Sequence, residues 1–154
     1  MMNVLVTGGA GYIGSHVVEE LQKNGFTPIV YDNLSTGHAA AVPEEVQLVE
    51  GDIHDVAFLK HIMAQFEIDA VIHFAASSLV GESMENPSKY YFNNVEGSLH
   101  LLEAMKGAGV DYIVFSSTAA VYGEPESVPI KEDSCLKPTK CLRPHEADDR
   151  KNAG

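Results

Sequence analysis

The sequence of 154 residues predicts an α/β fold in which helices cover both faces of a doubly wound parallel sheet. Short apolar runs rich in valine and isoleucine alternate with longer stretches that carry apolar residues at helical spacing. Continuous apolar runs are typical of parallel strands buried on both faces, and the helices between them supply right-handed crossovers. A glycine-rich turn directly follows the first run. The chain length is that of one domain with a single core.

Five apolar runs are the predicted strands, and we expect the sheet to be truncated after the fifth of them. In chain order the runs are Val4–Val6, Ile29–Tyr31, Val46–Val49, Ala70–Phe74 and Tyr112–Phe115.

Three longer stretches are the predicted helices. The first places apolar residues at Ile13, Val17 and Leu21 and stops at Gly25. The second carries an apolar stripe from Val56 to Phe66. The third opens at Asn86-Pro87, a capping residue followed by a first-turn proline, and ends at Gly107 and Gly109. We expect its inward face to consist of Tyr91, Val95, Leu99, Leu102 and Met105. Asp32 to Glu45 is predicted to be a loop with a short helix.

Charge and composition exclude several classes of protein. Ten basic and 22 acidic residues give a net charge of −12, which repels phosphate backbones and anionic lipids and argues against nucleic-acid and membrane binding. No apolar run approaches the roughly 20 residues that a membrane span needs. The two cysteines, Cys135 and Cys141, form no disulfide framework. We therefore expect a cytoplasmic protein.

The turn after the first strand predicts a dinucleotide site and a Rossmann-like fold. Gly8, Gly11 and Gly14 follow the strand and open the first helix, where a tight turn and a closely bound pyrophosphate both disfavour a Cβ. Asp32 ends the second strand, where a carboxylate accepts hydrogen bonds from ribose hydroxyls and repels a 2′-phosphate. The pattern favours NAD over NADP. The alternative is a structural turn with an exposed aspartate.

Other candidate residues follow the remaining strands, at the sheet edge where open α/β sheets bind ligands. Gly51–Ile53 is placed to flank an adenine, Phe74–Ala76 offers small residues for close approach, and Ser116–Thr118 offers three hydroxyls. For each of them, simple capping of a strand end is an equal alternative. His73 is interpreted as a core histidine with its hydrogen bonds satisfied. The histidines show no metal-ligand spacing, so no metal site is predicted.

Together these motifs resemble the extended short-chain dehydrogenase/reductase family, and within it the UDP-glucose 4-epimerases. The resemblance covers residues 2 to about 139. It is carried by the segments TGGAGYIGSH at 7–16, YDNLSTG at 31–37, EGDI at 50–53, VIHFAA at 71–76, VGES at 80–83, YYFNNVEG at 90–97 and FSSTAAVYGEP at 115–125.

The resemblance implies an NAD-dependent exchange of UDP-glucose and UDP-galactose through a 4-keto sugar. It implies a UDP-hexose substrate, a homodimeric parent protein, and Thr118 as the hydroxyl that orients the reacting oxygen. The implied cofactor-binding residues are Gly8, Gly11, Tyr12, Ile13, Gly14, Asp32, Asn33, Asp52, Ile53, Phe74, Ala75, Ala76, Ser77, Ser78 and Asn93. Related dehydratases place an Asp-Glu pair after this threonine, where this chain has Ala119-Ala120.

The sequence departs from the family at its end. The family's Tyr-x-x-x-Lys pair would fall at positions 142 and 146, which hold Leu142 and Glu146, and none of the six tyrosines has a lysine four places on. We therefore expect an incomplete NAD-binding domain over 1–139, a disordered tail over 140–154, and no sugar-binding domain in this chain.

Codon degeneracy offers an explanation for the tail. Possible codons for 140–154, read from the second base, permit Asn-Ala-Tyr-Gly-Arg-Thr-Lys followed by a helical pattern. We therefore hypothesise a one-base insertion near codon 140 and an inactive chain. The alternatives are a non-catalytic NAD-binding module and a fragment of a related dehydratase or reductase.

Overall fold

The computed structural model describes residues 1–125 and 127–137 and contains a parallel sheet of five strands in the order β3-β2-β1-β4-β5. The strands are β1 (Asn3–Thr7), β2 (Thr27–Asp32), β3 (Gln47–Glu50), β4 (Ala70–His73) and β5 (Tyr112–Phe115). All four strand pairs are parallel. The predicted α/β fold with a Rossmann-like sheet is confirmed, and every predicted strand is present.

The described residues divide into two compact units. The first contains 1–77 and 88–116 and holds the whole sheet, and the second contains 78–87 and the described residues from 117 onward. The second unit includes α3 (Val80–Glu85) and the 3₁₀ turn η3 (Ala119–Tyr122). The predicted boundary at residue 139 and the tail over 140–154 lie outside the described residues.

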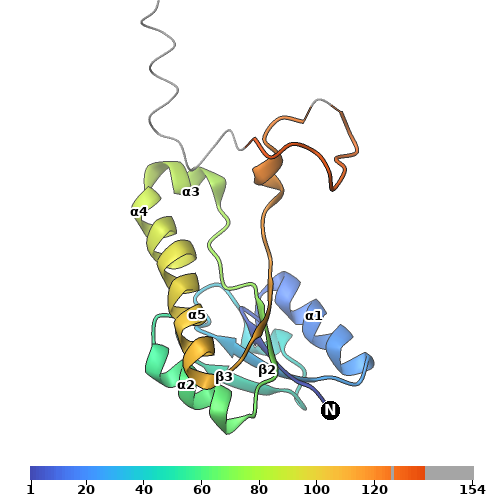
Figure 1. Ribbon diagram of the computed structural model, residues 1–154, viewed down its shortest axis with the longest axis vertical. Coiled ribbons are helices and arrows are strands. Elements are labelled where there is room, and N and C mark those ends of the chain that lie inside the picture. Colours follow the sequence, from blue (N-terminus) through green and yellow to red (C-terminus); the bar gives the residue numbers. More distant parts are fainter. Residues whose placement is uncertain (126, 138–154) are drawn as a thin grey trace, which may run out of the picture. The chain divides into compact units, whose positions relative to one another are not determined.

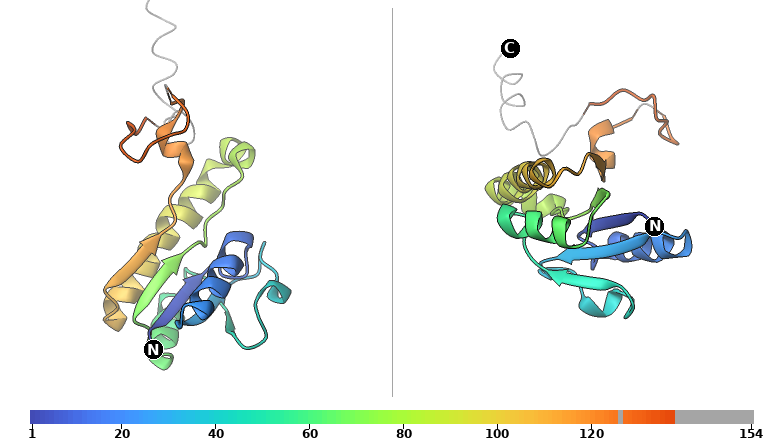
Figure 2. Two further views of the ribbon diagram at one scale, coloured as in Figure 1. Left: turned by 90° about the vertical axis from the view of Figure 1, so that its right-hand side faces the viewer. Right: turned by 60° about the horizontal axis from the view of Figure 1, so that its bottom comes forward.

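In the first unit, helices cover both faces of the sheet (Figure 1, Figure 2). Helix α1 (Tyr12–Lys23) packs on one face, while α2 (Val56–Gln65) and α5 (Gly97–Ala108) lie side by side on the other. The loop after β2 contains the predicted short helix as η1 (Ala39–Ala41). Helix α1 ends just before Gly25, whose φ of +80° is the left-handed conformation expected of a helix stop.

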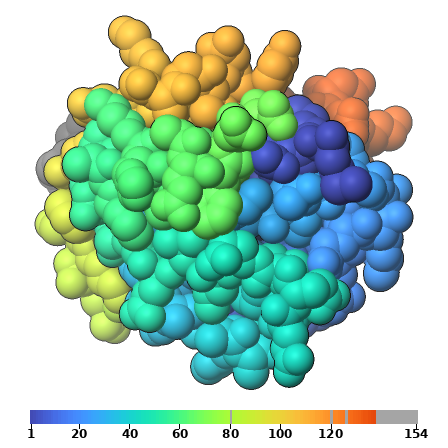
Figure 3. Space-filling view, turned by 90° about the horizontal axis from the view of Figure 1, so that it is seen from below, coloured from blue at the N-terminus to red at the C-terminus, as the bar shows by residue number. Residues whose placement is uncertain are grey.

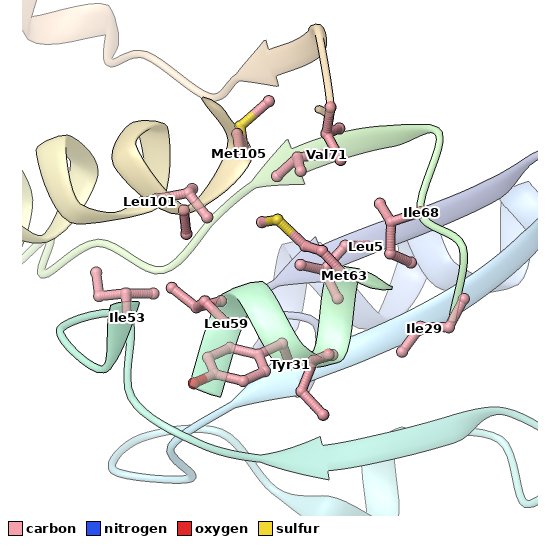
Figure 4. Packing of buried hydrophobic residues seen from close by; sticks show 13 residues of the cluster. Leu5, Ile29, Tyr31, Ile53, Leu59, Met63, Ile68, Val71, Leu101 and Met105 are labelled. Carbon is pink, nitrogen blue, oxygen red and sulfur yellow. The ribbon is translucent and has the colours of Figure 1, made fainter. Parts of the chain in front are cut away.

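The larger part of the core fills the space between the sheet and the pair α2 and α5 (Figure 4). Leu5 and Val71 from the sheet meet Leu59 and Met63 from α2 and Leu101 from α5, and all five are almost completely buried. Full burial of each such side chain stabilises the fold by about 1.5–3 kcal/mol relative to exposure. This packing fixes the position of the strand ends that carry the candidate site.

The prediction for the inward face of the third helix was largely wrong. The segment divides into α4 (Pro87–Tyr90), a π-helical stretch η2 (Tyr91–Glu96) and α5, and of the five residues predicted to face inward only Met105 is buried. The other four, Tyr91, Val95, Leu99 and Leu102, are exposed.

The face that packs inward instead consists of Gly97, Leu101, Ala104 and Met105. Gly97 explains why this face packs inward, because a Cβ there would collide with the Ile53 side chain. Its absence lets the helix approach the turn after β3 closely. The helix therefore has two apolar stripes, and the one with the small residue contacts the core.

The amino ends of the strands form the opposite edge of the sheet, viewed from below in Figure 3. There the chain start (dark blue) lies beside the segment that leads into β4 (green). The Asn3 amide donates to the Asp69 carboxylate over 2.7 Å, and its side-chain Nδ2 donates to the Phe66 carbonyl over 2.8 Å. No helix of the described residues is long and apolar enough to span a membrane.

Candidate functional site

The glycine-rich turn after β1 is closely packed against neighbouring main chain. Gly8 has a φ of +74°, and a Cβ there would lie 2.7 Å from the Ala75 nitrogen. A Cβ at Gly14 would collide with the Gly8 carbonyl oxygen. The turn, the first turn of α1 and the segment after β4 therefore approach one another only without side chains at Gly8 and Gly14, and close approach of a pyrophosphate stays a prediction.

The start of α1 presents donors to solvent. Gly11 occupies the N-cap position and has no side chain that caps the helix, and the next residues, Tyr12 and Ile13, are exposed. Unpaired first-turn N–H groups and the helix dipole favour an anion such as a pyrophosphate. This end of α1 therefore suits an anion, and the binding of a pyrophosphate there stays a prediction.

Asp32 is not the exposed aspartate of the alternative interpretation, since only 7% of its surface is exposed. Its Oδ2 accepts from the Ala10 amide over 3.0 Å, and its Oδ1 accepts from the Leu34 amide over 2.8 Å. The carboxylate therefore fixes the glycine-rich turn to the end of β2. Each oxygen retains a second lone pair for a further donor.

Asp52 and Asn33 meet at the same edge, from the turns after β3 and β2. The Asn33 side chain donates to Asp52 Oδ2 over 3.0 Å, and the Tyr31 hydroxyl donates to the Asp52 carbonyl over 2.9 Å. Burial raises the pKa of the Asp52 carboxyl, but the hydrogen bonds from Asn33 and His54 outweigh it, so the net pKa lies below its usual value. Burial and the charges of Asp55 and Asp52 raise the pKa of the Tyr31 hydroxyl.

His54 is a site neighbour that sequence reasoning missed. Its Nδ1 lies 2.6 Å from Asp52 Oδ1, and its Nε2 lies 3.1 Å from the Phe92 carbonyl oxygen. The ring also stacks on the Phe92 ring, with centroids 4.1 Å apart. The position two residues after Asp52 was the only signal in the sequence, and it does not reveal the contact with η2.

His73 at the end of β4 is the satisfied core histidine that the sequence predicts. Its Nε2 lies 3.1 Å from Ser98 Oγ, which donates its own hydrogen to the Asn94 carbonyl, so His73 is the donor in that pair. Its Nδ1 then accepts from the Thr7 hydroxyl over 2.6 Å. Burial lowers the pKa of His73 to about 4, so the ring is neutral at pH 7.

The π-helical stretch η2 holds the segment after β4. Asn94 Oδ1 accepts from the Ser77 amide over 2.8 Å, and Asn94 Nδ2 donates to the Ser77 carbonyl over 2.9 Å. The Asn93 side chain donates to Asn94 Oδ1. Asn94 was not among the predicted site residues, because the sequence offers two adjacent asparagines and no means of telling which one contacts the segment after β4.

The structure thus brings most of the predicted site residues to one edge of the first unit. These are Gly8, Gly11, Tyr12, Ile13, Gly14, Asp32, Asn33, Asp52, Ile53, Phe74, Ala75, Ala76, Ser77 and Asn93. Among them, Ile53 points away into the core. Ser78 and Thr118 belong to the second unit. Within it, the Val121 amide donates to the Thr118 carbonyl.

Comparison with known proteins identifies the family of the chain. A family model described as the NAD dependent epimerase/dehydratase family matches residues 4–148. The chain belongs to this family. The UDP-glucose 4-epimerase of Lactobacillus helveticus is 54% identical over 137 residues, which are 89% of this chain and 42% of the relative. That of Azospirillum brasilense is 53% identical over 144 residues, 94% of this chain and 40% of the relative.

Solved structures of family members share the fold. The UDP-glucose 4-epimerase of Brucella ovis in complex with NAD superposes with a TM-score of 0.85 at 50% identity, over 91% of this chain and 43% of that one. The enzyme of Stenotrophomonas maltophila with bound NAD and a formylated UDP-arabinopyranose gives a TM-score of 0.86 at 41% identity, over 91% and 44%. The chain spans about two fifths of the length of these relatives and corresponds to their N-terminal part.

The residues present suit NAD on structural grounds. The main chain is bare of side chains at Gly8 and Gly14, the α1 N-terminus lacks a side-chain cap, and a buried carboxylate ends β2. The first two features suit a pyrophosphate, and the third suits a ribose.

Proposed function

We propose that this chain binds NAD along the carboxyl edge of its sheet. The glycine-rich turn and the α1 N-terminus hold the pyrophosphate, Asp32 accepts from the adenosine ribose, and Asp52 lies beside the adenine. The observation that supports this most strongly is the Asp32 carboxylate, which is buried, bonded to the Ala10 amide of the turn, and has lone pairs to spare. A 2′-phosphate would bring negative charge against it, so NAD is preferred over NADP.

We further propose that the chain is the N-terminal part of a UDP-glucose 4-epimerase. The support is the length and identity of the match to such enzymes and the alanines at 119 and 120, where related dehydratases carry an Asp-Glu pair. In such a protein, bound NAD would accept a hydride from the sugar and return it, and the Thr118 hydroxyl would orient the reacting oxygen. A UDP-hexose substrate, a homodimer and a cytoplasmic location are parts of the same proposal.

The 154-residue chain itself is proposed to bind NAD without epimerising. Proton removal in this chemistry needs a tyrosine whose pKa a nearby lysine lowers, and none of the six tyrosines has a lysine four places on. The chain then acts as a binding module that lacks its proton-transfer pair.

The test is titration calorimetry of the purified chain with NAD and NADP, together with a UDP-galactose turnover assay. We expect NAD to bind, NADP to bind at least about tenfold more weakly, and turnover to equal the buffer blank. Asp32→Ala should weaken NAD binding about tenfold or more, whereas Glu45→Ala, which removes the same charge from an exposed position, should not. Absence of NAD binding, or turnover above the blank, contradicts the proposal.

We also propose that the codons for residues 140–154 are read one base out of frame. The support is the degenerate reading that places a tyrosine and a lysine where the family has them. Sequencing the gene through codon 139 and several hundred bases beyond decides this point. Removal of one base should restore Tyr-x-x-x-Lys and an open frame; a sequence in which no single-base change does so rejects the proposal.

A further inference from the structure

We propose that His54 is a positioning residue of the NAD site, and that its imidazolium form ties Asp52 to the π-helical stretch η2. The adenosine end of the site is then held more firmly when the ring carries both protons than when it carries one. The inference rests on the proposed NAD binding, and it goes beyond it by naming a residue and a pH dependence.

The ring lies between two acceptors. Its Nδ1 is 2.6 Å from Asp52 Oδ1, and its Nε2 is 3.1 Å from the main-chain carbonyl oxygen of Phe92. The His54 main-chain amide donates to the same Asp52 oxygen over 2.9 Å. The ring is thus held at both nitrogens, and only 18% of its side chain is exposed.

Neither acceptor has a hydrogen to give. An ionised carboxylate and a carbonyl oxygen only accept, and a neutral imidazole has one N–H and one lone pair. Both contacts are therefore hydrogen bonds only when the ring is an imidazolium. After loss of one proton, the remaining N–H bonds to one partner, and the nitrogen lone pair faces the oxygen of the other. The carboxylate is the stronger acceptor, so the bond to Phe92 is the one that is lost.

The Phe92 ring, His100 and α5 pack around the His54 ring. The Phe92 ring stacks on it at an interplanar angle of 6°, and His100 from α5 meets it edge to face at 5.5 Å. A Cβ on Gly97 would lie 3.4 Å from His54 Cε1, so the helix closes the third side. The ionisable groups that contact the ring among the described residues are Asp52 and His100.

The consequence for a ligand passes through Asp52. This carboxylate is half exposed, and its Oδ2 has one protein donor, Asn33, so a lone pair remains for a donor such as an adenine amino group. With His54 bonded at both ends, the turn that carries Asp52 is fixed to η2, which also carries the predicted cofactor residue Asn93. With the bond to Phe92 lost, the turn keeps its hydrogen bonds to Tyr31 and Asn33 on the β2 side, while its hold on η2 is reduced to the stacking of the His54 and Phe92 rings.

The experiment measures NAD affinity of the full chain by calorimetry between pH 6 and pH 8.5, for the wild type and three variants. His54→Asn keeps a neutral donor near the Nδ1 position, and His54→Gln keeps one near the Nε2 position. His61→Asn removes an exposed histidine of α2 as the matched control. We expect wild type and His61→Asn to bind NAD roughly three- to tenfold more weakly at pH 8.5 than at pH 6, and both His54 variants to lose this slope.

A second readout is independent of NAD. In ¹⁵N NMR of the histidine rings, the bond from His54 Nε2–H to the Phe92 carbonyl should be present when the ring carries two protons and absent when it carries one. A doubly protonated ring without that bond, or an unchanged slope in His54→Asn, overturns the inference. Absence of NAD binding by the wild type at every pH overturns both the proposed function and the part of this inference that concerns the ligand. In that case the NMR result alone tests the hydrogen bond from His54 to the Phe92 carbonyl.

Discussion

The centre of the sheet and the end formed by β5 differ in how completely they are covered. In β1 and β2, the residues from Val4 to Val6 and from Ile29 to Tyr31 are at most 3% exposed. In β5, at one end of the sheet, Tyr112 is 70% exposed and Val114 is 63% exposed. The outer stripe of η2 and α5 is similarly exposed, with Leu99 at 60%. Within the first unit, the part around β1 and β2 is therefore closed around its core (the closed half), and the part formed by β5 and the outer stripe of η2 and α5 presents apolar surface (the open half).

The difference indicates that one half serves ligand binding and the other serves self-association. The closed half carries the glycine-rich turn, Asp32 and Asp52, so its packing is sufficient to hold the proposed adenosine and pyrophosphate positions. The open half joins apolar residues of β5, η2 and α5, and such surfaces mark contact sites or association in a soluble protein. Changes in the closed half are therefore expected to alter stability and ligand affinity, and changes in the open half to alter self-association.

The largest effect is expected on α5, where the two faces can be compared directly. Leu101→Ala removes a completely buried side chain and should lower the free energy of unfolding by about 2–5 kcal/mol. Leu99→Ala, two residues earlier on the exposed face, should change it by less than about 0.5 kcal/mol. Urea unfolding of both variants measures the contrast, and equal losses would show that the outer stripe is buried in solution.

A second effect concerns the turn of the closed half. Gly14→Ala places a Cβ against the Gly8 carbonyl oxygen, so we expect a loss of about 1–3 kcal/mol in stability and a loss of NAD binding. Gly81→Ala is the control, because a Cβ there meets nothing within 4 Å. It should leave stability unchanged or slightly higher. NAD binding by Gly14→Ala at wild-type affinity would place the cofactor elsewhere.

A third effect is the pH dependence that His73 contributes to stability. Its pKa is about 4 in the folded chain and about 6.5 when unfolded, so the unfolded state binds the extra proton first as the pH falls. This contribution is fully present above pH 6.5 and declines toward pH 4, with a loss of about 1.5 kcal/mol between pH 6.5 and pH 5. His73→Gln, which cannot titrate, should show a shallower slope in that window; an identical slope would assign the pH dependence to other groups.

The smallest effect is expected at the exposed end of the sheet. Val114→Thr keeps the β-branched shape and should change stability by less than about 0.5 kcal/mol. It should nevertheless reduce concentration-dependent association, measured by analytical ultracentrifugation, because it removes exposed apolar surface. An unchanged association constant would show that β5 is not part of the surface through which the chain associates.

The strands and the ends of α1 and α5 were predictable because their signals are local, whereas α3 was not predicted. Apolar runs gave all five strands, and Gly25 and Gly109, both with positive φ, end α1 and α5 as expected. The inward face of α5 was not predictable, because the sequence carries two apolar stripes and only the contact of Gly97 with Ile53 selects one. The π-helical stretch was not predictable either, because the prediction assumed the α-helical period of 3.6 residues per turn.

The candidate site divides in the same way. Gly8, Gly14 and Asp32 were predictable, because a strand, a turn and a helix that follow one another in the chain bring them together. His54 and Asn94 were not, since their partners lie 38 and 17 residues away and depend on how α5 packs. Contacts of this kind follow from tertiary packing, which no local pattern encodes.

The most direct test of the central claim is amide chemical-shift mapping of the full chain by NMR during NAD titration. We predict saturable shifts at Gly8 to Gly14, Asp32 to Leu34 and Asp52 to His54, in the closed half, and unchanged amides in β5. Shifts confined to β5 and the outer stripe of α5, or no shifts at millimolar NAD, would contradict the account.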